Sequence, residues 1–313
     1  MGLPAVRGDG GSIESTIFDN QDDSDAILVG SSTMCTALRP VVVNRYFTQK
    51  LGREAKIRYL YLLRSKPDVH YLEIRDYLQT HHTKLIVLAM PERFQAQNSP
   101  DESICDILRF GEVPELYEGM SLGHKAAIYG EMVLNGPRQF LNAIRPNVLS
   151  KHEKTTDGLD EDVVHRYGKI DPLSITFEDS AERYLFSPGS DRLNFDSTSA
   201  GKSGYFGLMF SKILKLAKDH GAKVLLVNLP MSRDLDSDPI RVNLPKEVLD
   251  PGQSIVATSK ADLFGQISGK EAEKKYFQDP LHLNAEGAAI YSAKVIPALY
   301  SVFAGTNRPG AQK

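Results

Sequence analysis

The sequence predicts an α/β fold in which helices cover both faces of a mainly parallel sheet. Short continuous apolar runs, typical of buried parallel strands, alternate along the chain with segments of helical periodicity. The chain has 313 residues, of which 41% are hydrophobic and 25% charged. This composition is that of a folded globular protein rather than of a disordered chain.

Four apolar runs are the strand candidates, at residues 26–29, 58–63, 85–90 and 224–227. The first leads directly into Gly30-Ser31-Ser32-Thr33, as expected for a buried strand that ends in a tight turn. The third stops at Pro91, and the fourth stops at Asn228-Leu229-Pro230. Because parallel sheets bind ligands beyond the carboxyl ends of their strands, residues that follow these runs are candidates for a site.

Helices are expected where apolar residues recur every three or four positions. These segments are 69–80, 101–110, 124–144, 205–220 and 286–303, and residues 38–51 predict loop and helix. Gly221 is the expected stop of the helix at 205–220. Residues 232–275 predict polar loop and short helix.

The domain prediction is one α/β domain over residues 26–303. Residues 1–25 are rich in Gly and Asp and predict a flexible N-terminal arm, and residues 304–313 predict a tail. A less regular stretch at about 95–200 predicts an insertion rather than a second domain, because it shows no further alternation of strand and helix. Its most polar part holds the acidic cluster Asp157, Asp160, Glu161 and Asp162.

Charge and cysteine content exclude several classes of protein. The net charge is −3 and no long basic run occurs, so nucleic acid is a poor candidate partner. Two cysteines, Cys35 and Cys105, exclude a disulfide-rich scaffold. We find no apolar run near the roughly 18 residues that span a bilayer, and no signal-peptide pattern at the N-terminus. The chain as given is expected to be soluble, which leaves its compartment open.

Ser32 and a distant Asp-x-x-His pattern together carry a catalytic hypothesis. A serine on a strand-to-helix turn exposes its hydroxyl, and its own backbone N–H faces an oxyanion formed there. The hydroxyl needs a base, and His282 is the candidate. Asp279 lies three residues earlier, within reach of the imidazole on a turn. Each pattern alone also fits a helix cap or an ordinary loop, and only folding brings together residues 250 positions apart.

Both ends of this set resemble blocks of the SGNH (GDSL-like) hydrolase superfamily, in its Gly-Ser-Ser variant. The matching residues are Val29-Gly30-Ser31-Ser32-Thr33-Met34 and Asp279-Pro280-Leu281-His282-Leu283-Asn284-Ala285-Glu286-Gly287. The resemblance implies a three-layer α/β/α, flavodoxin-like fold with catalytic Ser32, His282 and Asp279. It implies a serine esterase or O-acyltransferase that acts through an acyl-enzyme on acyl, here expected acetyl, esters. This branch includes extracytoplasmic proteins of cell-wall and exopolysaccharide O-acylation.

The expected partners are therefore an acyl-ester or glycan substrate. The sequence leaves open whether the protein also has membrane-associated or polysaccharide-biosynthesis partners. It also leaves open whether this chain is the extracytoplasmic part of an anchored protein.

The sequence departs from the superfamily at the oxyanion hole. The superfamily has a glycine after the second strand and an asparagine after the third; here these places hold Leu63-Arg64-Ser65 and Pro91. Proline has no N–H to donate. The oxyanion-hole candidates are then the amides of Ser32 and Ser65, and Asn228 after the fourth strand. The alternative is a non-catalytic carbohydrate-binding or accessory protein on a degenerate SGNH fold.

Other patterns fit ordinary structure better than ligand binding. Residues 199–203 resemble the end of a phosphate-binding loop but lack its earlier glycine. His81-His82 predicts a polar turn, and Cys35 predicts a packed small side chain. Acidic residues that suit solvent-facing positions as well as a glycosidase pair are Asp106, Glu112, Glu115 and Glu118. We expect no cofactor and no metal ion.

Overall fold

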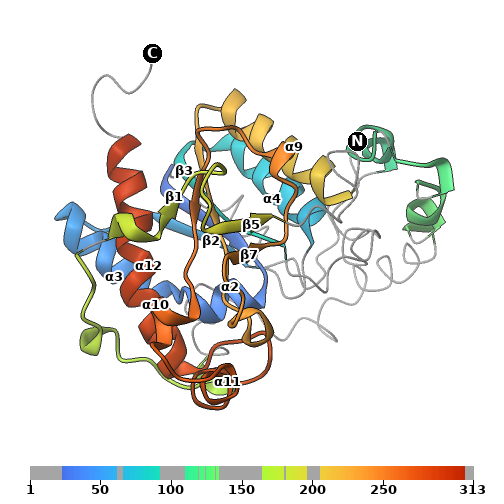
Figure 1. Cartoon of the computed structure of the whole chain (residues 1–313). Helices are drawn as coiled ribbons and strands as arrows, with labels where there is room; N and C mark the ends of the chain where they lie inside the picture. Colours follow the sequence, from blue (N-terminus) through green and yellow to red (C-terminus); the bar gives the residue numbers. More distant parts are fainter. Residues whose placement is uncertain are drawn as a thin grey trace.

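The centre of the protein is a six-stranded sheet with the order β2-β1-β3-β6-β8-β4 (Figure 1). The computed structural model describes residues 23–61, 66–91, 110–118, 120–123, 125–130, 132–133, 164–179, 181–195 and 205–306. The strands are β1 (Ser24–Gly30), β2 (Ile57–Tyr61), β3 (Thr83–Ala89), β6 (Lys223–Val227), β8 (Ser254–Val256) and β4 (Leu185–Phe186). All neighbours pair in parallel except β4, which is antiparallel to β8.

Helices cover both faces of this sheet (Figure 1). Ala26 and Leu28 of β1 point to a core formed with α2 (Ser32–Ala37), α3 (Pro40–Leu51) and α12 (Ala285–Thr306). Ile27 and Val29 point the other way, to a core formed with α4 (Pro67–Thr80) and α9 (Tyr205–Asp219). Because β1 is buried on both faces, its sequence is a continuous apolar run rather than an alternating one. The predicted α/β class with a mainly parallel, covered sheet is confirmed.

Shorter elements complete the described part of the chain. β5 (Leu193–Phe195) and β7 (Ile240–Val242) form a two-stranded parallel sheet. Further helices are α5 (Val113–Leu116), α10 (Lys260–Phe264) and α11 (Gly269–Tyr276), with 3₁₀ turns η3 (Phe110–Glu112), η4 (Pro172–Ser174), η5 (Ala181–Tyr184), η7 (Ser232–Asp234) and η8 (Lys246–Val248). Residues 122–123, 125–130, 132–133 and 164–167 are also helical. Gly221 follows α9 with a φ of 70°, as expected of the helix stop.

The structure corrects several element boundaries. β1 already includes Ser24 and Asp25, which were predicted to belong to the N-terminal arm, and α12 continues to Thr306 rather than ending at 303. β8 and β7 lie in a stretch predicted as loop and short helix, and β4 brings part of the predicted insertion into the main sheet. Strands of two or three residues are too short to show an alternating or continuous apolar pattern in the sequence. They become strands through pairing with their neighbours in the sheet.

Some predictions lie outside the described residues. They are most of the N-terminal arm (1–22), most of the tail (307–313), the acidic cluster at 157–162, the 199–203 segment, Cys105, Asp106, and residues 101–109 and 134–144 of two expected helices. Of the helix expected at 124–144, residues 125–130 and 132–133 are described and are helical, as predicted.

Helix α12 is longer and more apolar than the sequence predicted. Over Ala285–Gly305 its mean hydropathy is 1.3, so that by length and composition alone it would cross a membrane. However, 56% of that stretch is buried inside the protein, where Tyr291, Val295 and Leu299 belong to the core with α2 and α3. A central helix of a folded domain has the same properties, so this is weak evidence for a membrane span.

Asp25 is a nearly buried carboxylate at the start of β1. Its oxygens accept hydrogen bonds from Nη1 (2.8 Å) and Nη2 (2.6 Å) of Arg53, and from the N–H of Lys56 (3.0 Å). Desolvation raises the pKa of Asp25, but the hydrogen bonds from Arg53 and Lys56 outweigh it and hold that pKa below its ordinary value. The carboxylate therefore stabilises the fold above the unfolded pKa of about 3.9, and this contribution is lost as the pH falls through the folded pKa.

Replacing Arg53 with methionine tests this linkage. At pH 7 we expect the free energy of unfolding to fall by about 1–3 kcal/mol, because a desolvated carboxylate loses its charged partner. The deficit should shrink at a pH below about 4, where the carboxyl is protonated when the chain is unfolded. Urea unfolding at both pH values measures it. Lys215→Met, which breaks an exposed pair with Asp219, is the control and should cost under about 0.5 kcal/mol. A deficit for Arg53→Met that does not vary with pH would contradict the linkage.

Candidate active site

The candidate site lies at the carboxyl end of β1, where the order of the sheet changes direction. From β1 the chain adds β2 on one side and then returns to add β3 on the other. The connections that follow β1 and β3 diverge at such a point and leave a crevice. Gly30 ends the strand, and a Cβ there would lie 2.7 Å from the side chain of Met34. Glycine therefore lets α2 begin directly after β1, with Ser32 as its first residue.

Ser32 and its neighbour Ser31 have different tasks at this turn. Ser31 is the N-cap of α2, and its Oγ accepts a hydrogen bond from the N–H of Thr33. Ser32 is half-buried, and its Oγ lies 2.9 Å from Nε2 of His282. The N–H of Ser32 is the first of the helix and has no partner within it. One residue thus provides a hydroxyl next to a base and a backbone N–H that the helix itself leaves unpaired.

Asp279 orients His282 from the opposite side of the ring. Both carboxylate oxygens lie 2.8 Å from Nδ1 of His282, and Oδ1 also accepts the backbone N–H groups of Leu281 and His282 at 2.9 Å. Desolvation raises the pKa of Asp279, but the hydrogen bonds from Leu281 and His282 outweigh it and lower that pKa. A neutral His282 then carries its proton on Nδ1, facing the carboxylate. This leaves the Nε2 lone pair to accept the Ser32 hydroxyl proton.

The loop that carries Asp279 and His282 is closed at its base. The N–H of Gln278 donates to the carbonyl of His282 (2.9 Å), and the N–H of Asn284 donates to the carbonyl of Tyr276 (3.0 Å). Asn284 also caps α12, because its Oδ1 accepts the N–H of Gly287 at 3.0 Å. The Asp-x-x-His-Leu-Asn pattern is therefore one structural unit that ends in the first turn of α12.

Gly287 lets this first turn pack against the end of α11. A Cβ at Gly287 would collide with the backbone carbonyl oxygen of Tyr276, the same oxygen that accepts the N–H of Asn284. We expect Gly287→Ala to destabilise the protein by about 1–3 kcal/mol, because rigid backbone must move. Gly305→Ala is the matched control in the same helix: a Cβ there meets nothing within 4 Å, and the variant should gain up to about 1 kcal/mol in helix propensity. Urea unfolding compares the two, and equal effects would contradict the steric explanation.

The predicted oxyanion donors have different outcomes. Ser65 lies outside the described residues. The N–H of Asn228 donates to the carbonyl of Val256 (2.8 Å), and its Nδ2 donates to the carbonyl of Arg241 (3.0 Å). Asn228 thus joins β6 to β8 and to β7, and it is poorly suited to a developing oxyanion. Pro91 follows β3 as predicted and offers no N–H. The Ser32 amide is the candidate that the structure places next to the reacting hydroxyl.

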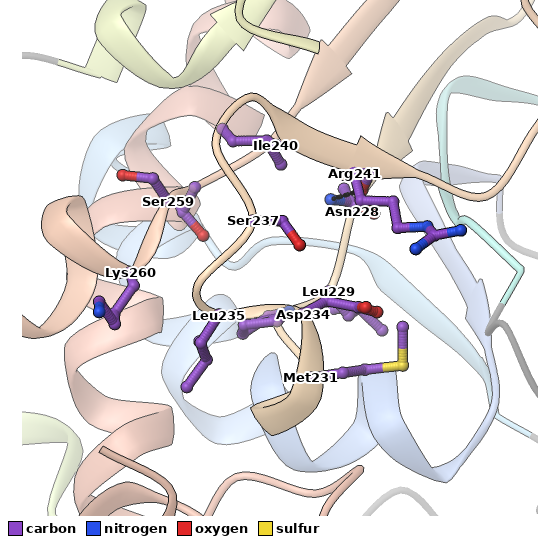
Figure 2. Close-up of a pocket in the computed structure, with 12 residues that line it drawn as sticks. Asn228, Leu229, Met231, Asp234, Leu235, Ser237, Ile240, Arg241, Ser259 and Lys260 are labelled. Atoms are coloured by element: carbon purple, nitrogen blue, oxygen red, sulfur yellow. Dashed lines mark hydrogen bonds between the residues drawn. The ribbon is translucent and has the colours of Figure 1, made fainter. Parts of the chain in front are cut away.

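A small pocket lies beyond the ends of β6 and β8, and Figure 2 shows residues that line it. Its lining includes Asn228, Ser237 and Thr258. The segment after β6 that lines the pocket is joined to the loop that carries Asp279 and His282, because the N–H of Ser232 donates to the carbonyl of Pro280 (3.1 Å). Its volume is about 20 Å³, enough for about one water molecule. The buried Oγ1 of Thr258 has no hydrogen-bond partner among the described residues and suits such a water. This pocket is too small for an ester or a sugar.

A larger pocket of about 360 Å³ lies on another surface, between α3, the middle of α12 and residues 178–183. Its lining includes Pro297, which is about 18 Å along α12 from Ala285 at a rise of about 1.5 Å per residue. Ser32, Asp279 and His282 do not line either pocket. Within the candidate site, the side chain of His282 is 14% exposed and that of Asp279 is 44% exposed.

Other residues that the sequence singled out have ordinary packing or ion-pair contacts in the structure. His81 is buried and stacks on Tyr77. Cys35 is buried in the core, and Glu112 pairs with Arg75 (3.0 Å). Within the described ranges, no group of three or more His, Cys, Asp and Glu side chains could hold a metal ion.

The sequence did not predict one residue that lies beside His282. The ring of Tyr167 packs against the imidazole of His282, with 5.1 Å between the ring centroids. Tyr167 lies in the stretch predicted as a polar insertion, where a lone aromatic residue carries no signal of its own.

No protein-family model matches the chain, and no curated protein is detectably similar to it.

Proposed function

We propose that this protein is a serine esterase or O-acyltransferase of the SGNH type. The observation that carries the proposal is the continuous hydrogen-bonded chain from Ser32 Oγ through His282 to Asp279. The order of its parallel strands supports the same conclusion, because β2-β1-β3-β6-β8 corresponds to the flavodoxin-like arrangement that the resemblance implies.

The reaction follows from the roles of the three side chains. Ser32 Oγ attacks the acyl carbon while Nε2 of His282 takes the hydroxyl proton, and Asp279 stabilises the imidazolium. The Ser32 amide donates to the oxyanion of the tetrahedral intermediate. The C–O bond to the leaving alcohol then breaks, and His282 returns the proton to that alcohol. Water or a sugar hydroxyl next attacks the acyl-enzyme, with His282 again as base, and Ser32 is regenerated.

The resemblance also bears on the class of substrate. It implies a bulky alcohol component such as a cell-wall or extracellular polysaccharide, of which one esterified hydroxyl would reach Ser32. We assign the acyl group to the small, acetyl-like class that the resemblance implies.

Labelling with a fluorophosphonate tests the proposal. The probe phosphonylates an activated serine, and peptide mass spectrometry of the folded, full-length chain should place the label on Ser32. The same preparation should hydrolyse an aryl acetate. A folded protein that is neither labelled at Ser32 nor active on the ester would count against catalysis.

A non-catalytic carbohydrate-binding role is the second candidate. The absence of an N–H at Pro91 and the engagement of Asn228 favour it, because losing one oxyanion donor costs about 10²–10³ in rate. This role predicts glycan binding that is unchanged in Ser32→Ala, together with no ester turnover by the wild type. Wild-type turnover that disappears in Ser32→Ala would eliminate it.

A further inference from the structure

Arg39 is a charged side chain in the protein interior, with only 1% of its surface exposed. Its Nη1 donates to the carbonyl of Gly168, and its Nη2 donates to the carbonyl of Tyr167 at 3.3 Å. A buried guanidinium is costly unless such hydrogen bonds compensate its desolvation. Arg39 is the N-cap of α3, directly after the helix that begins with Ser32. It therefore ties the Tyr167 segment to the helical pair that carries the candidate nucleophile.

Tyr167 is held between this guanidinium and the loop that carries Asp279 and His282. Its side chain is buried, and its ring is tilted by 38° to the imidazole of His282. Gly168 follows with a φ of 86°, a left-handed conformation that turns the chain sharply and favours glycine. A Cβ at Gly168 would lie 3.3 Å from the Cβ of Ala285, the first residue of α12. The segment is thus in close contact with the helix that starts three residues after His282.

We propose that Tyr167 is a positioning residue for His282, and that Arg39 holds Tyr167 in place. This inference rests on the proposed function. Both ring nitrogens of His282 are hydrogen-bonded at the edges of the ring, to Ser32 and to Asp279. These bonds leave the ring faces to be supported by packing, and Tyr167 packs against the imidazole. The contact keeps Nε2 aimed at Ser32 Oγ.

Tyr167 also belongs to the hydrophobic core, so the test separates positioning from stability. We expect Tyr167→Leu, which keeps an apolar side chain, to lower kcat and the rate of fluorophosphonate labelling by about 10- to 100-fold, with KM changed less than about threefold. Tyr167→Phe keeps the ring and should stay within about twofold of the wild type. Arg39→Met should resemble Tyr167→Leu, and the double variant should be no worse than either single variant, because both act on one contact.

Tyr300→Leu is the matched control. This tyrosine packs against Phe47 and Phe303 near the other end of α12. Its loss should lower the free energy of unfolding and leave the labelling rate per folded molecule unchanged. If Tyr300→Leu slows labelling as much as Tyr167→Leu does, the effect is one of general stability and positioning is overturned.

A second measurement keeps the inference separate from catalysis. The Nδ1 proton between His282 and Asp279 is expected to give a low-field NMR signal, which should broaden in Tyr167→Leu but not in Tyr300→Leu. A wild type that is not labelled at Ser32 overturns the proposed function, whereas the NMR comparison still tests the support of the ring. A labelled wild type, with Tyr167→Leu equal to it in labelling rate and NMR signal, overturns the positioning role alone.

Discussion

Replacing Ser32 with alanine is expected to abolish ester turnover, with a loss on the order of 10⁴-fold or more. The variant keeps the helix and the N-cap but removes the oxygen that lies 2.9 Å from Nε2 of His282. Without that oxygen no acyl-enzyme forms, and the residual rate depends on binding and on the remaining backbone donor. Steady-state hydrolysis of an aryl acetate, corrected for the folded fraction, measures the loss.

Ser31→Ala is the matched control, because it removes the adjacent hydroxyl. Ser31 is buried, and its Oγ bonds the N–H (3.4 Å) and Oγ1 (2.8 Å) of Thr33, so its role is that of a helix cap. We expect a loss of about 1 kcal/mol in the free energy of unfolding. Turnover per folded molecule should stay within about tenfold of the wild type, far above the Ser32 variant. Equal losses of turnover in both variants would show that the turn, and not the Ser32 hydroxyl, is required.

Asp279→Asn is expected to lower turnover by about 10³- to 10⁴-fold while the protein stays folded. The new side-chain oxygen still accepts the N–H groups of Leu281 and His282, which preserves the loop. The amide NH₂, however, faces Nδ1 and donates to it. The proton of the imidazole is then on Nε2, which can no longer accept the proton of Ser32. Ester hydrolysis and the labelling rate should fall together.

Glu286→Gln provides the control for charge near this loop. Glu286 is an exposed carboxylate of the same sequence block, 3.6 Å from Lys275, and it is not part of the triad. Its removal should leave turnover within about twofold of the wild type. If Asp279→Asn also remains active, another group orients His282 and the assignment of Asp279 is wrong.

The parts of the fold that the sequence predicted are those whose signal is local. Residues 26–29, 85–89 and 224–227 form strands in the structure because a continuous apolar run is buried on both faces of the sheet. β8 was missed because three residues, Ser254–Val256, become a strand through pairing with β6. The helix that begins at Ser32 was read as a tight turn, since six residues carry less than two full turns of periodicity.

The candidate site also combines features that have a local sequence signal with features that do not. Ser32 in a turn after a buried strand, and Asp279 three residues before His282, are patterns that short-range geometry explains, and both could be read from the residues alone. Neither motif contains the contact between them, because it depends on the register of the sheet and on the packing of α12.

The sequence by itself determined the residue types, their order and the local turns that expose them. Only the tertiary structure decided that Ser32 and His282, 250 positions apart, meet at 2.9 Å. It also decided that the donors of Asn228 are used between strands, that Tyr167 packs against His282, and that Arg39 bonds the backbone carbonyl of Tyr167. The physical reason is that turns and caps depend on a few neighbouring residues. A hydrogen bond between distant residues depends on every element packed between them.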